Sequence, residues 1–128
     1  MKKKISFGLP DSGVPSEWAV ESDGILYTVH WACLPDGSCA PGGIRDQTRV
    51  TLENLRHAVQ AAGGTMDDVV QVQVYLTSPD NFVGMNEVYG TFFRSPYPNR
   101  ATIIAGIMIP GGLIEIVARA HVGRSGKS

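Results

Sequence analysis

The chain has 128 residues, of which 43% are hydrophobic and 18% charged, so its composition is that of one globular domain with a buried core. Eleven basic and twelve acidic side chains give a net charge of -1 and form no basic stripe, which disfavours a nucleic-acid partner. Pro10 follows the basic start before any apolar stretch, so this segment does not resemble a signal peptide. The uncharged run 101–114 is shorter than the roughly 20 residues of a membrane helix. We therefore expect a soluble, cytoplasmic protein with no membrane partner, a single domain at 1–122 and a disordered tail at 123–128.

The first half of the chain predicts a strand, a loop and a helix. Residues 24–33 are rich in Tyr, Thr, Val and Trp, which favour a strand. The prolines and glycines of 35–43 end this strand in a loop. From 45 to 62 apolar residues recur at three- and four-residue spacing, which predicts an amphipathic helix, and the glycine pair 63–64 ends it.

The next segment predicts a strand and a second helix. Thr65 with Asp68 is typical of a capped single turn, and residues 70–76 then alternate between apolar and polar side chains as a strand does. Ser78 suits the N-cap of the following helix, and Pro79 suits its first position.

The block 101–122 consists of two apolar stretches separated by the turn sequence 110–112, a pattern that favours a β-hairpin. Strands that alternate with helices predict an α+β fold, in which right-handed crossovers place both helices on one face of the sheet. We expect the opposite face to be solvated or, preferably, to lie against other subunits.

Two charged residues, Arg100 and Glu115, flank strongly apolar strands and must find a partner, water or a ligand there. Salt bridges at an edge or interface are the commoner explanation. In a functional reading, Arg100 forks onto a substrate carboxylate and Glu115 handles a proton or a water. A hairpin would pair Arg100 near Val122 and leave Glu115 roughly 23 Å away along the strands. A site that contains both residues therefore requires two subunits.

The stretch YTVHWACLPDGSCAPGG, residues 27–43, contains His30, Cys33 and Cys39, which match no common zinc spacing, so we predict no metal site. A disulfide between the two cysteines across the turn is geometrically possible, but a cytoplasmic location disfavours it. His30 and Cys33 are three residues apart and point to opposite faces of a strand, which disfavours a histidine-activated thiol nucleophile. In the simplest reading Tyr27, Val29 and Cys33 pack inward and His30 faces the other way.

Several segments, in order, resemble one known family. They are QTRVTLENL, AAGGTMDDVV, VYLTSPDNF, MNEVYGTFF and the pattern IEI-A-A, and the likeness extends over at least residues 15–122. Together they resemble the RidA (YjgF) family. The resemblance implies a chorismate-mutase-like fold and a homotrimer whose sheets face inward, with three active-site clefts between subunits. It also implies hydrolysis of reactive enamine or imine intermediates to 2-keto acids and ammonia, without a cofactor.

The resemblance also assigns residues to the site. Arg100 matches the arginine that holds the substrate carboxylate, and Glu115 matches a glutamate of the water-handling group. Phe82 and Asn86 match helix residues that line the pocket. His30 falls on or beside the cleft, where it is either a second acid/base group, since its ordinary pKa lies near neutrality, or a simple lining residue.

The chain departs from the family pattern in the pocket wall. Trp18 follows the first proline segment where a tyrosine is usual, Val29 and His30 replace a serine and a glycine, and Thr102 stands where a cysteine is frequent. We therefore expect Trp18, Val29 and Thr102 to contact the substrate of a divergent member with an altered wall.

This wall suggests a substrate larger or more unsaturated than 2-aminoacrylate, such as a 2-aminomuconate-type intermediate. The alternative is a non-catalytic trimer that binds small carboxylates or regulates a partner. An older ribonuclease label of the family is disfavoured by the near-neutral charge.

Overall fold

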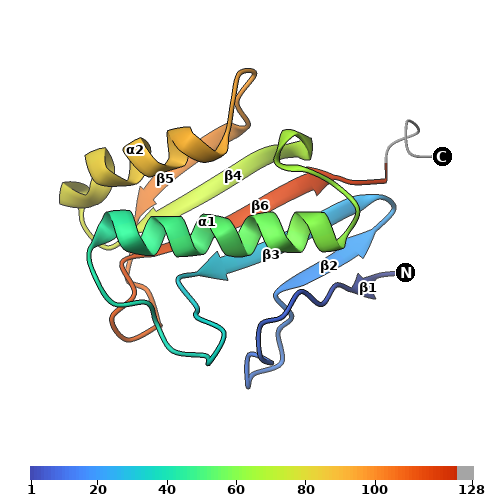
Figure 1. Ribbon diagram of the computed structural model, residues 1–128, viewed down its shortest axis with the longest axis horizontal. Coiled ribbons are helices and arrows are strands. Elements are labelled where there is room, and N and C mark those ends of the chain that lie inside the picture. Colours follow the sequence, from blue (N-terminus) through green and yellow to red (C-terminus); the bar gives the residue numbers. More distant parts are fainter. Residues whose placement is uncertain (124–128) are drawn as a thin grey trace.

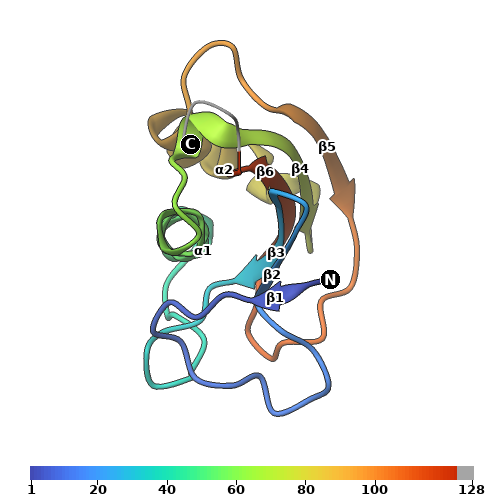
Figure 2. The ribbon, with the colours of Figure 1, turned by 90° about the vertical axis from the view of Figure 1, so that its right-hand side faces the viewer.

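The computed structural model describes residues 1–123, which form one mixed sheet with two helices packed on one of its faces (Figures 1 and 2). The strand order is β1-β2-β3-β6-β4-β5, and β4 pairs in parallel with β5 and antiparallel with β6. The strands are β1 (Lys3–Lys4), β2 (Ala19–Ser22), β3 (Ile25–Trp31), β4 (Val69–Leu76), β5 (Asn99–Ile104) and β6 (Ile114–His121). The helices are α1 (Ile44–Ala61) and α2 (Phe82–Phe92), with single 3-10 turns at Met66–Asp68 and Pro79–Asn81.

The hydrophobic core lies between the helices and the inner face of the sheet. Alternate residues of β4 and β6 point into it, while the residues between them form the open face. Helix α1 buries Leu52, Leu55 and Val59 completely, and each such side chain contributes roughly 1.5–3 kcal/mol of burial free energy. The buried core residues of β4 and β6 are Val69, Val72, Val74, Leu76, Ile114, Ile116, Ala118 and Ala120.

The capped turn expected between α1 and β4 is present. Gly63 adopts a positive φ of 91° after the helix, a conformation that glycine reaches without strain. The Thr65 amide then donates a hydrogen bond of 2.8 Å to Asp68, completing the capping box. This compact reversal directs the chain from α1 straight into β4.

Helix α2 lies close against α1 because of one small residue. A Cβ on Gly84 would come within 2.7 Å of an Ile44 methyl carbon, so a larger side chain would push the helices apart. Arg45 of α1 forms a two-point ion pair with Glu87 of α2, with N–O distances of 3.2 and 2.9 Å. The Ser78 hydroxyl accepts a hydrogen bond from the Asp80 amide, so Ser78 caps the 3-10 turn that leads into α2, whereas α2 itself begins at Phe82 after Asn81.

The predicted hairpin between the last two strands is wrong. β5 ends at Ile104 and pairs with β4, so that Arg100 lies opposite Val72, and β6 occupies the other side of β4. The apolar residues that resembled a continuing strand form a long loop that passes the end of β4. Its turn is closed by a hydrogen bond from the Gly112 amide to the Ile109 carbonyl.

Three other expectations need correction or completion. The short strands β1 and β2 were not predicted. In β3 the alternation was right but the faces were reversed, because Thr28 and His30 are buried whereas Tyr27 is exposed. At the expected tail, the Gly123 amide donates to the Gly24 carbonyl, and residues 124–128 lie outside the described part. Within residues 1–123, no helix is long and apolar enough to cross a membrane.

Candidate functional site

Arg100 lies on β5, at the edge of the sheet, and its side chain points toward α2. Its guanidinium carbon is 4.6 Å from the centre of the Tyr89 ring, and Nη1 is 3.9 Å from the Met85 sulfur. Across residues 1–123, no carboxylate forms an ion pair with this guanidinium. A partly buried arginine held by an aromatic face and lacking a counter-charge is suited to binding an anionic ligand through its planar fork.

The phenol of Tyr89 adds a second donor beside Arg100. Burial raises the pKa of Tyr89 to about 12, although the neighbouring Arg100 cation acts in the opposite direction. The hydroxyl therefore keeps its proton at neutral pH. The hydroxyl is buried beside Arg100, which can only donate to it, so its own proton stays available to a ligand oxygen.

The other residues expected on the carboxylate side lie on α2 and β5 as well. Phe82 and Asn86 lie one turn before Met85 and Tyr89 respectively on α2, on neighbouring rows of the helix surface. Phe82 keeps 44% of its surface exposed. Thr102 follows Arg100 by two residues on β5, so both side chains point to the same face. Phe82 and Asn86 thus share α2 with the residues that contact Arg100, and Thr102 shares its strand, while their contact with a substrate stays a prediction.

Glu115 lies on the open face of the sheet. Its neighbours across the strands are Trp31 of β3 and Tyr75 of β4, while Val29 lies one pleat away beside Val117. Glu115 is partly buried among these side chains, and this burial raises its pKa. No hydrogen bond or ion pair to its carboxylate exists among the residues that the structure describes, so it is available to a water or a substrate.

One chain does not bring Arg100 and Glu115 together. Arg100 of β5 pairs with Val72 of β4, and Val72 pairs with Ala118 of β6. Glu115 lies three residues before Ala118 on β6. Two strand spacings and three residues separate the Cα atoms by about 14 Å, less than the hairpin distance. The odd number of residues also places the two side chains on opposite faces. The requirement for two subunits therefore persists, although the register on which it was based was wrong.

His30 does not reach the open face. It is completely buried, stacks parallel on Trp18 at 6.2 Å and contacts the Phe7 ring edge-on at 5.5 Å. Its Nε2 is 2.6 Å from the Thr28 hydroxyl, which itself donates to the Trp18 carbonyl at 2.9 Å. Since that hydroxyl has one proton, Nε2 is the donor, and the ring is the neutral tautomer with a bare Nδ1.

This burial makes His30 a source of pH-dependent stability. Desolvation lowers its pKa from 6.5 to about 3, so the unfolded chain takes up a proton that the folded chain refuses. Its contribution is complete above pH 6.5 and is lost as the pH falls from 6.5 toward 3. The wild-type free energy of unfolding should fall between pH 7.5 and pH 5. In His30→Phe, which keeps the ring stacking, we expect this fall to be smaller by up to about 2 kcal/mol. Urea unfolding at both pH values measures this difference, and an unchanged pH dependence would contradict it.

The chain is similar to known proteins in sequence and in fold. A family model described as endoribonuclease L-PSP matches residues 14–122. The chain is 40% identical over 107 residues to the protein mmf2, mitochondrial, of Schizosaccharomyces pombe, covering 81% of this chain and 85% of that one.

The chain belongs to the RidA, or L-PSP, family.

Solved structures of other members share its fold. RidA of an Antarctic Psychrobacter superposes with a TM-score of 0.86 at 27% identity, covering 94% of this chain and 99% of that one. TdcF of E. coli, solved with bound serine, gives a TM-score of 0.86 at 29% identity over 96% and 99% of the two chains. The mixed sheet with two helices on one face is the chorismate-mutase-like fold of these relatives. Since the S. pombe relative is named as mitochondrial, the cytoplasmic location stays a prediction.

Four residues around the candidate site were not predicted as part of it. Met85 and Tyr89 of α2 belong to the core and also hold Arg100. Trp31 and Tyr75 flank Glu115 from both sides. Strand alternation carried the missing signal, because it places Trp31 on the same face as Val29.

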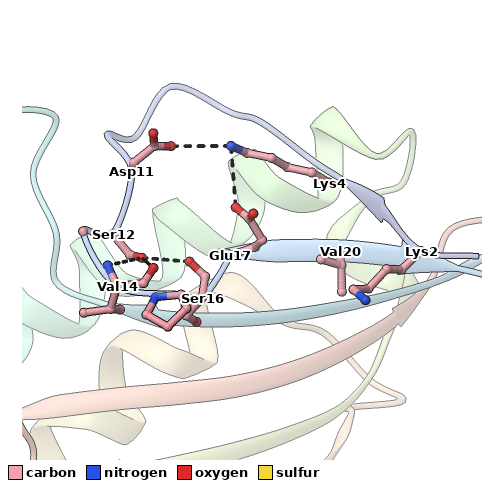
Figure 3. Close-up of a pocket in the computed structure, with 10 residues that line it drawn as sticks. Lys2, Lys4, Asp11, Ser12, Val14, Ser16, Glu17 and Val20 are labelled. Carbon is pink, nitrogen blue, oxygen red and sulfur yellow. Dashed lines mark hydrogen bonds and ion pairs between the residues drawn. The ribbon is translucent and has the colours of Figure 1, made fainter.

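A separate hollow of about 760 Å³ opens at the other edge of the sheet, around β1, β2 and the loop before β2 (Figure 3). Its Lys4 is already paired with Asp11 at 3.4 Å and with Glu17 at 3.6 Å. Since β1 and β5 are opposite edges of the sheet, this hollow is remote from Arg100. We assign it no part in the site.

Proposed function

We propose that this RidA-family protein is an imine/enamine deaminase that hydrolyses a carboxylate-bearing imine to a 2-keto acid and ammonia. The observation that carries the proposal is the Arg100 guanidinium, which is fixed against Tyr89 and has no counter-charge in the described chain. Such a group is prepared for a carboxylate, which every imino acid carries. An imine protonated on nitrogen is already electrophilic, so the chemistry requires no metal or organic cofactor.

The proposed reaction uses two residues from different chains. Arg100 binds the substrate carboxylate by two charge-assisted hydrogen bonds and fixes the orientation of the C=N group. The partner subunit's Glu115, as a carboxylate, accepts a hydrogen bond from a water and directs its oxygen at the imine carbon. The C–O bond forms as the water gives a proton to the Glu115 carboxylate, and the resulting carboxylic acid then protonates the amino group of the aminoalcohol. The C–N bond breaks as the C=O bond forms, and ammonia leaves. The products are the 2-keto acid and one ammonia for each water consumed.

A homotrimer with inward-facing sheets would supply the second chain. The open face is partly apolar, since Tyr27 is 40% exposed and Ile103 is 42% exposed on it, with Val29 and Val117 nearby. Packing this face against a second copy would cover apolar surface. It would also bring Glu115 toward the edge that carries Arg100 of the next subunit.

The proposed substrate is larger than 2-aminoacrylate, for instance a 2-aminomuconate-type intermediate. Val29 and Trp31 add bulky apolar side chains on the Glu115 side. Trp18 lies 5.7 Å from Trp31, and its indole nitrogen is held by the Pro10 carbonyl at 2.8 Å, so this wall is fixed. We leave His30 out of the proposed catalytic set because its ring is enclosed on the other side of β3.

The second candidate function is binding without catalysis. Support for it comes from the relative TdcF, whose structure contains bound serine, a small carboxylate. In that case Arg100 would hold a carboxylate that is not converted, and the altered wall would select it for a regulatory purpose. The endoribonuclease name of the family model is not supported by the net charge of -1.

Ammonia release from imino acids separates these functions. An amino-acid oxidase generates 2-iminopropionate and longer or unsaturated imino acids in situ, and semicarbazide competes for the free imine. We expect the protein to accelerate ammonia release and to favour the longer imino acids. A folded protein that binds the corresponding amino or keto acids but accelerates no imine would be a carboxylate-binding protein. Fastest turnover of 2-iminopropionate would contradict the larger substrate alone.

A further inference from the structure

Cys33 and Cys39 lie directly opposite each other where the chain reverses after β3. They form an isolated antiparallel bridge, and both thiols are free. Two backbone hydrogen bonds of 2.8 Å enclose the pair, one on each side. They join the Leu34 amide to the Ser38 carbonyl and the Ala40 amide to the Ala32 carbonyl.

This arrangement is a non-hydrogen-bonded antiparallel pair, in which the Cα atoms are about 4.5 Å apart and both side chains leave the ribbon on the same side. A separation of that size falls within the range of roughly 4.4–6.8 Å found across disulfides. Rotation of the two side chains is therefore sufficient to join the sulfurs. The backbone can stay in place.

The turn between the cysteines is held in this register by its own hydrogen bonds. Asp36 accepts from both the amide and the hydroxyl of Ser38, at 2.9 and 2.6 Å. The Gly37 amide donates to the Leu34 carbonyl, and Gly37 has a positive φ of 90°. On the other side, the Asn54 side chain donates to the Cys33 carbonyl at 2.9 Å. The pairing of the thiols thus belongs to the ordered fold.

We propose that Cys33 and Cys39 are a reversible oxidation site. A small-molecule disulfide such as oxidised glutathione oxidises the two thiols to an intramolecular disulfide. Cys39 is partly exposed and reacts first: its thiolate attacks the glutathione disulfide, forms a mixed disulfide and releases one glutathione thiol. The buried Cys33 then attacks the Cys39 sulfur and releases the second glutathione. The two cysteine thiols lose two protons and two electrons, and the electrons reduce the glutathione disulfide to two thiols.

The environment of the pair sets the pace of this exchange. Burial raises the pKa of both thiols, and the negative charge of Asp36 raises that of Cys33 further. Few thiolates exist at neutral pH, and their number grows as the pH rises. The exchange is therefore slow at neutral pH and accelerates as the pH rises. The pair would respond slowly to changes in the redox potential of its surroundings.

The test uses the full-length protein with oxidised glutathione at pH 7 and pH 8.5, followed by intact mass and thiol titration. We expect both thiols to disappear, with the mass of the monomer lower by two hydrogens, no retained glutathione, and faster reaction at the higher pH. Reduction should restore both thiols. The matched variants are Cys33→Ser, which should stop as a glutathione adduct on Cys39, and Cys39→Ser, whose buried Cys33 should stay unmodified.

Three results would overturn the proposal. One is a wild-type protein that keeps glutathione on Cys39, since Cys33 would then fail to complete the bond. The second is persistence of both thiols at pH 8.5 under conditions that modify an exposed cysteine peptide. The third is a disulfide between chains. None of these outcomes depends on whether the protein hydrolyses imines, because the readouts are mass and thiol content.

Discussion

Arg100→Ala is expected to lower kcat/KM for an imino acid by about 10²–10³-fold or more while the protein still folds and assembles. The guanidinium supplies both the charge and the orientation that hold the substrate carboxylate, so its loss affects binding and the alignment of the C=N group together. The fold should tolerate the change, because the contacts of Arg100 among residues 1–123 are with the Tyr89 side chain and, weakly, with the Met85 sulfur, and none is an ion pair. Ammonia release measures the activity, and light scattering after size exclusion measures the assembly.

Arg100→Lys sharpens this expectation. Lysine keeps the positive charge but has a point charge in place of a planar fork, so it cannot form the two parallel hydrogen bonds. Activity between that of the wild type and that of Arg100→Ala would show that charge and geometry both contribute.

Arg56→Ala is the matched control, because Arg56 also places its guanidinium over an aromatic ring, 5.2 Å from the centre of Phe92. It lies on α1, outside the proposed site, so this variant should retain wild-type activity. Arg100→Ala protein with unchanged kinetics would refute the proposed carboxylate anchor. Loss of assembly in Arg100→Ala alone would assign this arginine a structural role.

Glu115→Gln should lower kcat by about 10²–10⁴-fold, the usual range for loss of a positioned acid/base group. Glutamine has nearly the same shape but accepts hydrogen bonds less strongly and takes up no proton, so the attacking water would lose its orientation. Carboxylate binding through Arg100 should persist. We therefore expect kcat to fall much more than the affinity for a keto-acid product.

The raised pKa of Glu115 adds a pH signature. Because burial favours the neutral acid, the carboxylate form and the activity should disappear on acidification at a pH above the ordinary 4.5 of a glutamate. For stability the sign is opposite to that of His30: the folded protein binds this proton more tightly than the unfolded chain, so the carboxylate disfavours folding at neutral pH. Glu115→Gln should thus melt at the same temperature as the wild type or slightly higher.

Glu21→Gln, at a glutamate of β2 in the same sheet, is the control for charge removal outside the site. Kinetics over pH 4–8 and thermal melts of both variants provide the measurements. A Glu115→Gln protein with an intact acid limb would show that another group titrates in the reaction. A strongly destabilised one would contradict the availability of the Glu115 carboxylate.

Periodicity in the sequence was enough to predict the local elements. The apolar spacing of α1, the capping residues Thr65 and Asp68 and the start at Ser78 are each determined by near neighbours along the chain. Strand pairing is a long-range property, and here the sequence was misleading. The apolar loop after Ile104 resembles a strand, whereas β5 gains its partner from β4, which precedes it by a whole helix.

The site was predictable by residue type more than by position. Arg100 and Glu115 are charges in apolar strands, and that contrast is visible in any sequence. The face on which a side chain lies was harder to predict at β3, since both of its faces carry apolar or aromatic residues. His30 is enclosed by Phe7 and Trp18, which come from a segment without a recognisable strand pattern.

The placement of Arg100 and Glu115 on opposite faces of one sheet has a genetic consequence. Under the proposed arrangement each site contains residues from two chains, so a chain that lacks Arg100 still supplies Glu115 to the site of a neighbouring subunit. Two alleles, each inactive alone because one lacks Arg100 and the other Glu115, would complement each other in mixed trimers. With equal, random assembly, half of the sites receive a sound arginine and half of those a sound glutamate, so about one site in four is rebuilt. For such a protein, activity depends on which two subunits meet at an interface, and a single chain does not determine it.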